Sequence, residues 1–202
     1  TRQVVVDELG YYAASRKEGE SAVPENVLSA IIQATEDAEP GVRAEACHAL
    51  GLLVSREAAE KSADRVVAAL VKVLGDEAVT ERNISGYRPT SVQSEACRAL
   101  GRCGAKAAPA VPALIELVQR EVKREEEKMK FLRWLAARRA AIQALGEIGP
   151  AAEAAVPVLE ALDKNPNHHA AVRRALSQIR PRDRDPRFPL PQRPAAADRP
   201  DD

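Results

Sequence analysis

The feature that most constrains this chain is a segment that recurs four times without internal gaps. The four copies occupy residues 40–53, 90–103, 135–148 and 166–179. A weaker fifth copy near the start of the chain ends at Gly10 and Tyr11. Successive anchor residues, Gly10, Gly51, Gly101, Gly146 and Ser177, are 41, 50, 45 and 31 residues apart. Periods in this range predict a stack of helical repeats.

Apolar or small residues recur within each copy at the spacing i, i+3, i+4 and i+7, which is one face of an α-helix. The first copy places Ala46, Ala49, Leu50 and Leu53 on this face, and the others place 96, 99, 100 and 103, then 141, 144, 145 and 148, then 172, 175, 176 and 179. The second of these columns is always Ala, and Gly follows two residues later in three copies. Because Gly inside a helix costs about 1 kcal/mol relative to Ala, we expect both columns to allow close helix packing.

A second helical pattern precedes each copy. Residues 67–74, 111–118 and 156–162 follow one template, and Pro24, Pro112 and Pro157 lie near the expected helix starts, where proline is tolerated. We therefore expect a leading helix followed by helix pairs at 24–54, 64–104, 109–148 and 152–180. Residues 79–89 are expected to form a loop insertion in the second pair. Residues 119–133, with alternating charges, are expected to extend the first helix of the third pair.

The pattern Val42, Arg43, Ala46, Ala49, Leu50 and Gly51, followed by Val-Pro-x-Leu, resembles HEAT repeats. It is most similar to the short bacterial type first noted in phycobilisome lyases. The resemblance implies an all-α fold, an α-solenoid of stacked antiparallel helix pairs (a HEAT-like superhelix) over residues 1–180, with the second helix of each pair lining a concave surface. Two departures are the Arg43 column, which becomes Gln93, Arg138 and His169, and the uneven repeat lengths. Residues 181–202 are rich in Pro, Arg and Asp, so we expect a flexible tail or linker.

The composition and charge of the chain indicate which partners and which compartment to expect. Thirty basic residues balance thirty acidic residues, so no global field favours nucleic acid or an anionic membrane. The first residues lack the charged and apolar pattern of a signal peptide, and no apolar run is long enough to span a membrane, so cytoplasmic location is the default expectation. Because the chain starts at Thr1 and its first helix is unpaired, we expect a piece of a longer protein or complex, or otherwise a monomer.

Catalytic, metal and cofactor sites are not expected. Cys47 and Cys97 share a column, but neighbouring helices lie about 8–10 Å apart and disulfide Cα atoms lie within about 7 Å, so we expect buried free thiols. His168 and His169 are adjacent in a helix and diverge by about 100°, so they do not chelate one ion together. Asn83 begins a glycosylation sequon. Such triplets are common by chance and matter only in a secretory compartment.

The variable columns of the second helices are the candidate binding residues, because they avoid the apolar face and are expected to meet solvent. They include three sets, namely Glu45, Glu95, Ala140 and Ala171; His48, Arg98, Gln143 and Arg174; and Leu52, Arg102, Glu147 and Gln178. The predicted partner-binding residues are Glu45, His48, Glu95, Arg98, Arg102, Arg139, Gln143, Glu147, Arg174 and Gln178. The alternative is an ordinary solvated helix face.

The sequence therefore favours a non-catalytic protein–protein interaction scaffold that presents a helical groove to another protein or peptide. One alternative is a bilin-lyase-like or other HEAT-type enzyme accessory, although aromatic residues form only 3% of the chain and a planar tetrapyrrole favours an aromatic site. A second alternative is a nucleic-acid-binding HEAT stack. Its candidate phosphate contacts are Arg133, Arg138, Arg139, Arg173 and Arg174, which are interspersed with carboxylates.

Overall fold

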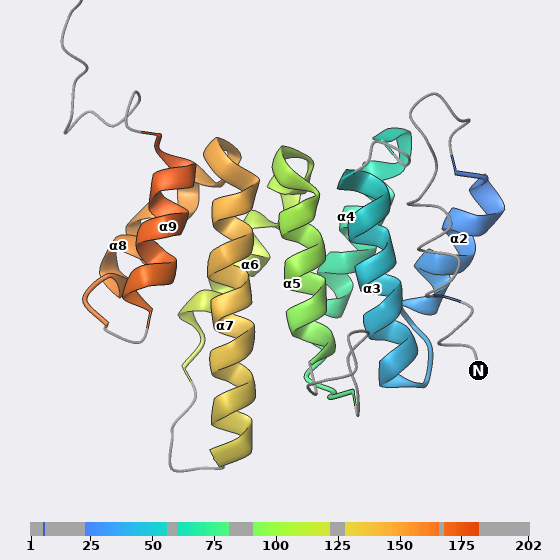
Figure 1. Ribbon diagram of the computed structural model, residues 1–202, viewed down its shortest axis with the longest axis horizontal. Coiled ribbons are helices and arrows are strands. Elements are labelled where there is room, and N and C mark those ends of the chain that lie inside the picture. Colours follow the sequence, from blue (N-terminus) through green and yellow to red (C-terminus); the bar gives the residue numbers. More distant parts are fainter. Residues whose placement is uncertain are drawn as a thin grey trace, which may run out of the picture.

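The computed structural model describes Val6 and residues 23–55, 60–80, 91–121, 128–165 and 168–181. The described helices form a linear stack of antiparallel pairs (Figure 1). The pairs are α2 (Glu25–Ala34) with α3 (Pro40–Ser55), α4 (Ala63–Val73) with α5 (Val92–Arg102), α6 (Val111–Gln119) with α7 (Lys128–Ile148), and α8 (Val156–Leu162) with α9 (His169–Ile179). The predicted all-α solenoid is confirmed, and the described pairs lie close to the expected ranges.

The stack has two rows of helices (Figure 1). The second helices α3, α5, α7 and α9 lie side by side and pack directly on one another along the row. The first helices touch their neighbours mainly through two 3-10 segments, η2 (Gly104–Ala110) and η3 (Gly149–Ala155). The row of second helices is therefore the more closely packed side, and it is the side that the HEAT resemblance predicts to be concave.

The predicted apolar face forms the core between repeats. Ala46, Leu50, Leu100 and Leu145 are all fully buried, and the equivalent residues of the other copies are buried with one exception. Leu176 in α9 is only partly buried. The reason is its position, because α9 is the last described helix and has no further described helix beyond it to cover this face.

The glycine column lies against the alanine column of the next repeat. A Cβ atom built on Gly51 would lie 2.7 Å from the Cα atom of Ala99, and one built on Gly146 would lie 2.8 Å from the Cα atom of Ala175. Real Cβ atoms do not approach this closely, so any larger residue would push the helices apart. Ser177 in α9 is exposed, as expected at the end of the described row.

The two 3-10 segments follow the second helices and occupy equivalent places in their repeats. Gly104 and Gly149 adopt φ values of 57° and 74°, a left-handed conformation that glycine adopts without the steric cost of a side chain. Each segment then runs into a first helix with proline in its first turn, as predicted for Pro112 and Pro157. These segments were not apparent from periodicity, since they are short and rich in alanine.

One predicted boundary is wrong. Residues 119–133 do not extend the first helix of the third pair, because α6 ends at Gln119 and the chain at Arg120 is extended, with φ −57° and ψ 130°. Residues 128–133 instead begin α7, whose first turns reach beyond the end of α5 (Figure 1). Phe131 and Trp134 extend the helical spacing of the apolar face of α7 toward its N-terminus, and their ring centroids lie 5.3 Å apart.

The ends of the predicted loop insertion are held together where the structure describes them. Val79 and Ser91 form an isolated antiparallel bridge, and the amide of Val92 donates to the carbonyl of Ala78 at 3.0 Å. Residues 81–90, which include the sequon at Asn83, lie outside the described residues. The tail from residue 182 also lies outside them, as does the leading helix apart from Val6, which is helical and buried.

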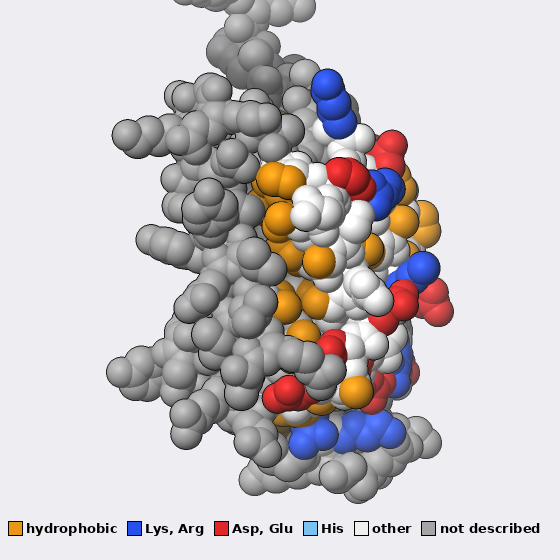
Figure 2. Space-filling view, turned by 90° about the vertical axis from the view of Figure 1, so that its right-hand side faces the viewer, with side chains coloured by type: hydrophobic (Ala, Val, Ile, Leu, Met, Phe, Trp, Pro, Cys, Tyr) orange, Lys and Arg blue, Asp and Glu red, His pale blue; other side chains and the backbone are white. Residues whose placement is uncertain are grey.

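The α2 end of the stack carries a group of apolar side chains (Figure 2). Leu28 and Ile31 of α2 are buried, while Val27 and Ile32 are partly buried against the core. Charged side chains lie above, below and to the right of this apolar area in the same view. α2 therefore turns its apolar face inward and ends the described part of the stack.

Candidate functional site

Most of the predicted partner-binding residues lie on the exposed side of the second helices. We call eight of them the polar ladder: His48 of α3, Arg98 and Arg102 of α5, Arg139, Gln143 and Glu147 of α7, and Arg174 and Gln178 of α9. Each is exposed or half-buried. The described part of the row therefore presents polar side chains from four neighbouring second helices.

Several ladder side chains reach across from one helix to the preceding one. Arg102 of α5 and His48 of α3 share a hydrogen bond of 2.9 Å between Nη1 and Nδ1. The carboxylate of Glu147 lies over Gly101, and the side-chain oxygen of Gln178 lies over Gly146. The glycine column thus leaves room for the next helix's polar side chains. The ladder is a continuous surface rather than separate helix faces.

Two predicted residues do not belong to this surface. Glu45 and Glu95 are only 4% and 8% exposed, so the expectation that they face solvent is wrong. Their column lies between adjacent second helices: Ala140, in the same column, is also buried, and Ala171 in the last helix is partly exposed. A helix with neighbours on both sides buries a wider arc than its apolar stripe. Arg98 covers Glu95 with an ion pair of 2.5 Å.

The predicted basic group of the C-terminal half is divided in the structure. Arg138 is buried and its guanidinium lies over the ring of Trp134, 4.9 Å from the centroid. Arg173 pairs with Asp163 at 3.3 Å. Arg139 and Arg174 are exposed, and no ion pair joins either to a described residue. Only part of the predicted group is therefore available to a ligand.

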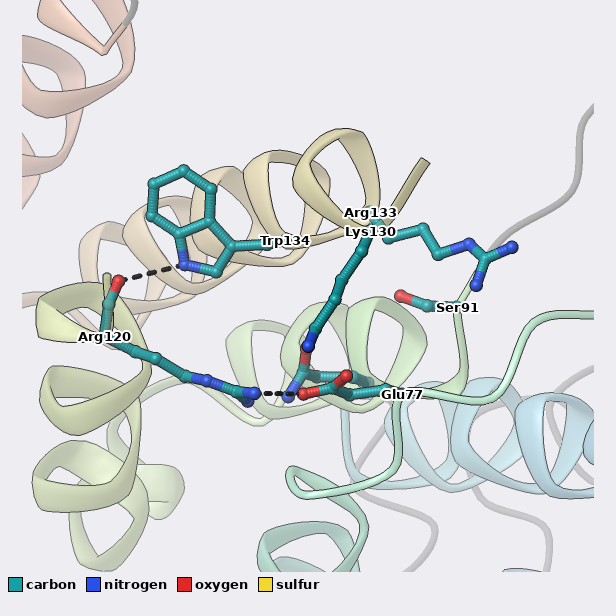
Figure 3. Close-up of a pocket in the computed structure, with 7 residues that line it drawn as sticks. Glu77, Ser91, Arg120, Lys130, Arg133 and Trp134 are labelled. Atoms are coloured by element: carbon teal, nitrogen blue, oxygen red, sulfur yellow. Dashed lines mark hydrogen bonds and ion pairs between the residues drawn. The ribbon is translucent and has the colours of Figure 1, made fainter. Parts of the chain in front are cut away.

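A recess of about 220 Å³ lies where α5, α6 and α7 meet, and it was not predicted. Its lining residues are Glu77, Ser91, Gln93, Arg120, Lys130, Arg133 and Trp134. The indole Nε1 of Trp134 donates to the carbonyl of Arg120 at 2.9 Å, while the Arg120 guanidinium pairs with Glu77. Lys130 extends from α7 toward Glu77, and Arg133 extends toward Ser91 (Figure 3).

The sequence contained one partial signal for this recess. Trp134 is the only tryptophan of the chain, and Lys130 and Arg133 precede it by four and one positions, which places the three on one side of a helix. The remaining lining residues come from other elements, and only the fold brings them together.

Comparison with known proteins gives the repeat a name. Residues 137–165 match the family model described as the PBS lyase HEAT-like repeat. They cover the second half of α7, then η3, α8 and the turn that follows. This segment is a HEAT-like repeat. The whole stack is also similar to the crystal structure of an engineered protein, with a TM-score of 0.53 and 22% identity over 88% of this chain and 72% of the other. At that identity the likeness concerns the fold alone. The comparison with curated proteins gave no match.

The residues in the column of Arg43 contact the turns between helices of the stack. Nε of Arg43 donates to Oδ2 of Asp76 in the next repeat at 2.6 Å, and Nη1 donates to the carbonyl of Asp37 at 2.8 Å. Gln93, the next member of the column, donates its side-chain amide to the carbonyl of Leu74. The ring of His169 contacts the carbonyl of Asp163 at 3.0 Å. These residues hold turns in place, while Arg138 departs from the pattern by stacking on Trp134.

The three cysteines are core residues. Cys47, Cys97 and Cys103 are free and buried. Burial raises the pKa of Cys97 to about 12 and that of Cys103 to about 11, and it raises the pKa of Cys47 as well. Thiols with raised pKa values are poor nucleophiles and metal ligands at neutral pH. Among the described residues no group of three His, Cys, Asp or Glu is placed to hold a metal ion.

His168 is the N-cap residue of α9 and is only 3% exposed. Burial lowers its pKa, and the nearby charges of Arg138 and Arg139 on α7 lower it further. Among the residues that the structure describes, the ring atom Nδ1 has no hydrogen-bond partner. The folded protein therefore holds this imidazole in its neutral form at neutral pH.

The free energy of unfolding is expected to fall as the pH drops through the ordinary pKa of histidine, about 6.5. The unfolded chain binds a proton there that the folded chain refuses, so stability is retained above this pH and lost below it. Urea denaturation between about pH 7.5 and 5.5 measures the slope. His168→Gln is expected to flatten it, and the matched variant His169→Gln is expected to retain it. An unchanged slope in His168→Gln would contradict the assignment.

Proposed function

We propose that this chain is a non-catalytic scaffold whose row of second helices binds an elongated macromolecular partner, another protein or a peptide. The observation that supports this most is the polar ladder, a continuous surface built from four neighbouring second helices. The glycine column of one helix packs closely against the alanine column of the next. Closely packed helices have spacings of about 8–10 Å. A rigid array of that kind recognises a partner by presenting side chains at fixed intervals.

Arg139, Gln143 and Arg174 are the ladder residues we expect to contribute most to binding. All three are exposed. The two arginines form no ion pair with a described residue, so they are free to pair with a partner carboxylate. Arg98 serves less well as a test residue, because its removal would strip the cation from the buried carboxylate of Glu95 and destabilise the fold.

The proposal predicts that the triple variant Arg139→Ala, Gln143→Ala, Arg174→Ala loses affinity for a partner captured by the intact chain. We expect at least a tenfold loss, which is about 1.4 kcal/mol. The matched control removes two cations and one amide from the first helices, in Arg65→Ala, Lys72→Ala, Gln119→Ala, whose side chains are also exposed. Calorimetry or surface plasmon resonance measures both. Equal affinities of the two triple variants would refute the proposal.

The recess and the described helices bear on the alternatives. Sites for drug-sized ligands occupy about 300–1,000 Å³, so a recess of about 220 Å³ suits a side chain better than a tetrapyrrole. None of the described helices has the length and apolar character to cross a membrane. The dispersed arginines favour protein over nucleic acid, since a phosphate backbone requires several aligned cations.

A further inference from the structure

The recess beside α7 carries more positive than negative charge. Three cations, Arg120, Lys130 and Arg133, line it together with one carboxylate, Glu77. Glu77 is paired with Arg120, whereas Lys130 and Arg133 are exposed and form no ion pair with a described residue. Among the described residues that line the recess, the three cations therefore outnumber the single carboxylate.

The aromatic wall of the recess is held in a fixed position. Trp134 donates its indole N–H to the carbonyl of Arg120 at 2.9 Å, and the ring packs against Phe131. Arg138, buried and lying over the ring, adds a cation–π contact. The indole therefore offers a rigid apolar surface to a ligand without reorganising.

We propose that this recess binds a glutamate or aspartate side chain from an acidic linear segment of a partner protein, with the carboxylate between Lys130 and Arg133 and the aliphatic part against Trp134. The inference deepens the proposed function, because it names one anchor point and the chemistry of the partner. The small volume fits a side chain, and the two free cations complement a carboxylate. Glu77 in the wall disfavours a polyanion such as nucleic acid, whose closely spaced phosphates would approach it.

The sole tryptophan makes the proposal directly measurable, since emission excited at the red edge of its absorption comes from Trp134 alone. The probes are a short peptide of alternating glutamate and leucine, the matched peptide of glutamine and leucine, and single-stranded oligo-dT. Titration of the glutamate peptide into the intact chain is expected to change the emission with saturation. The glutamine peptide is expected to bind at least about tenfold more weakly.

The charge-reversed variant Lys130→Glu, Arg133→Glu is expected to lose at least about tenfold in affinity for the glutamate peptide. Lys61→Glu, Lys164→Glu is the matched control: it changes the net charge equally at exposed positions outside the recess lining, and is expected to bind as the parent chain does. Circular dichroism verifies that both variants fold. Equal binding of the two peptides, or an equal loss in the control, would overturn the proposal, and tighter binding of oligo-dT would assign the recess to nucleic acid instead.

This experiment fails separately from the test of the polar ladder. If the intact chain captures a partner through the ladder but does not bind the glutamate peptide, only the recess assignment is wrong. If the peptide binds at the recess while the ladder triple variant keeps full partner affinity, the recess stands and the proposed role of the ladder is wrong.

Discussion

Leu145→Ala is expected to lower the free energy of unfolding by about 2–5 kcal/mol, the range for removal of a fully buried leucine side chain. Leu145 is completely buried in α7, which packs against α5 on one side and α9 on the other. The substitution leaves a cavity that close-packed helices cannot collapse into. Urea denaturation of the purified chain, followed by circular dichroism at the helix band, measures the loss.

Leu176→Ala is the matched control, since Leu176 occupies the same column in α9 but is only partly buried. Leu176→Ala removes the same atoms but less buried apolar surface. The free energy of unfolding is therefore expected to fall by less than half as much as in Leu145→Ala. Equal losses in the two variants would contradict a linear array in which α9 lies at the end of the described row.

Gly51→Ala and Gly146→Ala are expected to destabilise the stack by about 1–3 kcal/mol each, the typical cost of overpacking. Alanine is the better helix former by about 1 kcal/mol, so an isolated helix would gain stability from the same change. In the stack the new Cβ atoms would meet the backbone Cα atoms of Ala99 and Ala175 at 2.7 and 2.8 Å. Backbone cannot swing aside as a side chain does.

Two other glycines, Gly101 and Gly75, are expected to show smaller destabilisation when replaced by alanine. A Cβ atom on Gly101 would meet the mobile carboxylate end of Glu147 first and the Cα atom of Ala144 only at 3.2 Å, and one on Gly75 would meet nothing within 4 Å. Gly101→Ala is therefore expected to cost less than Gly51→Ala, and Gly75→Ala to change stability by no more than about 0.5 kcal/mol. The order of the urea midpoints tests this. A Gly51→Ala protein more stable than Gly75→Ala would exclude the close helix contact.

The sequence predicted the helix pairs because the residues that a helix buries are apolar and recur at the helical period. The alanine, leucine and glycine columns recur at the spacing of one helix face, and the structure buries that face. It did not predict η2 and η3, whose short alanine-rich sequences carry no period. It placed residues 128–133 in the wrong helix, since the neighbouring run of charged residues obscured the spacing of Phe131 and Trp134 that belongs to α7.

The candidate surface was predictable only in part. The exposure of a side chain depends on how neighbouring helices pack against its own helix, and the apolar pattern of one helix does not contain that information. The ladder positions around Gln143 are exposed as expected. Glu45 and Glu95 are buried because a neighbouring second helix packs against each of their helices, which polarity alone does not reveal. The recess draws Glu77, Arg120 and Trp134 from different elements, so the spacing of Lys130, Arg133 and Trp134 in the sequence marks only its α7 wall.

Site-specific photo-cross-linking tests most directly where a partner lies. A photoreactive residue in place of Gln143, on the second helix α7, is compared with one in place of Gln119, on the first helix α6; both side chains are exposed. The captured partner is expected to cross-link strongly from position 143 and at background level from position 119. Cross-linking from position 119 alone would show that the partner binds the row of first helices, and the proposed role of the polar ladder would be wrong.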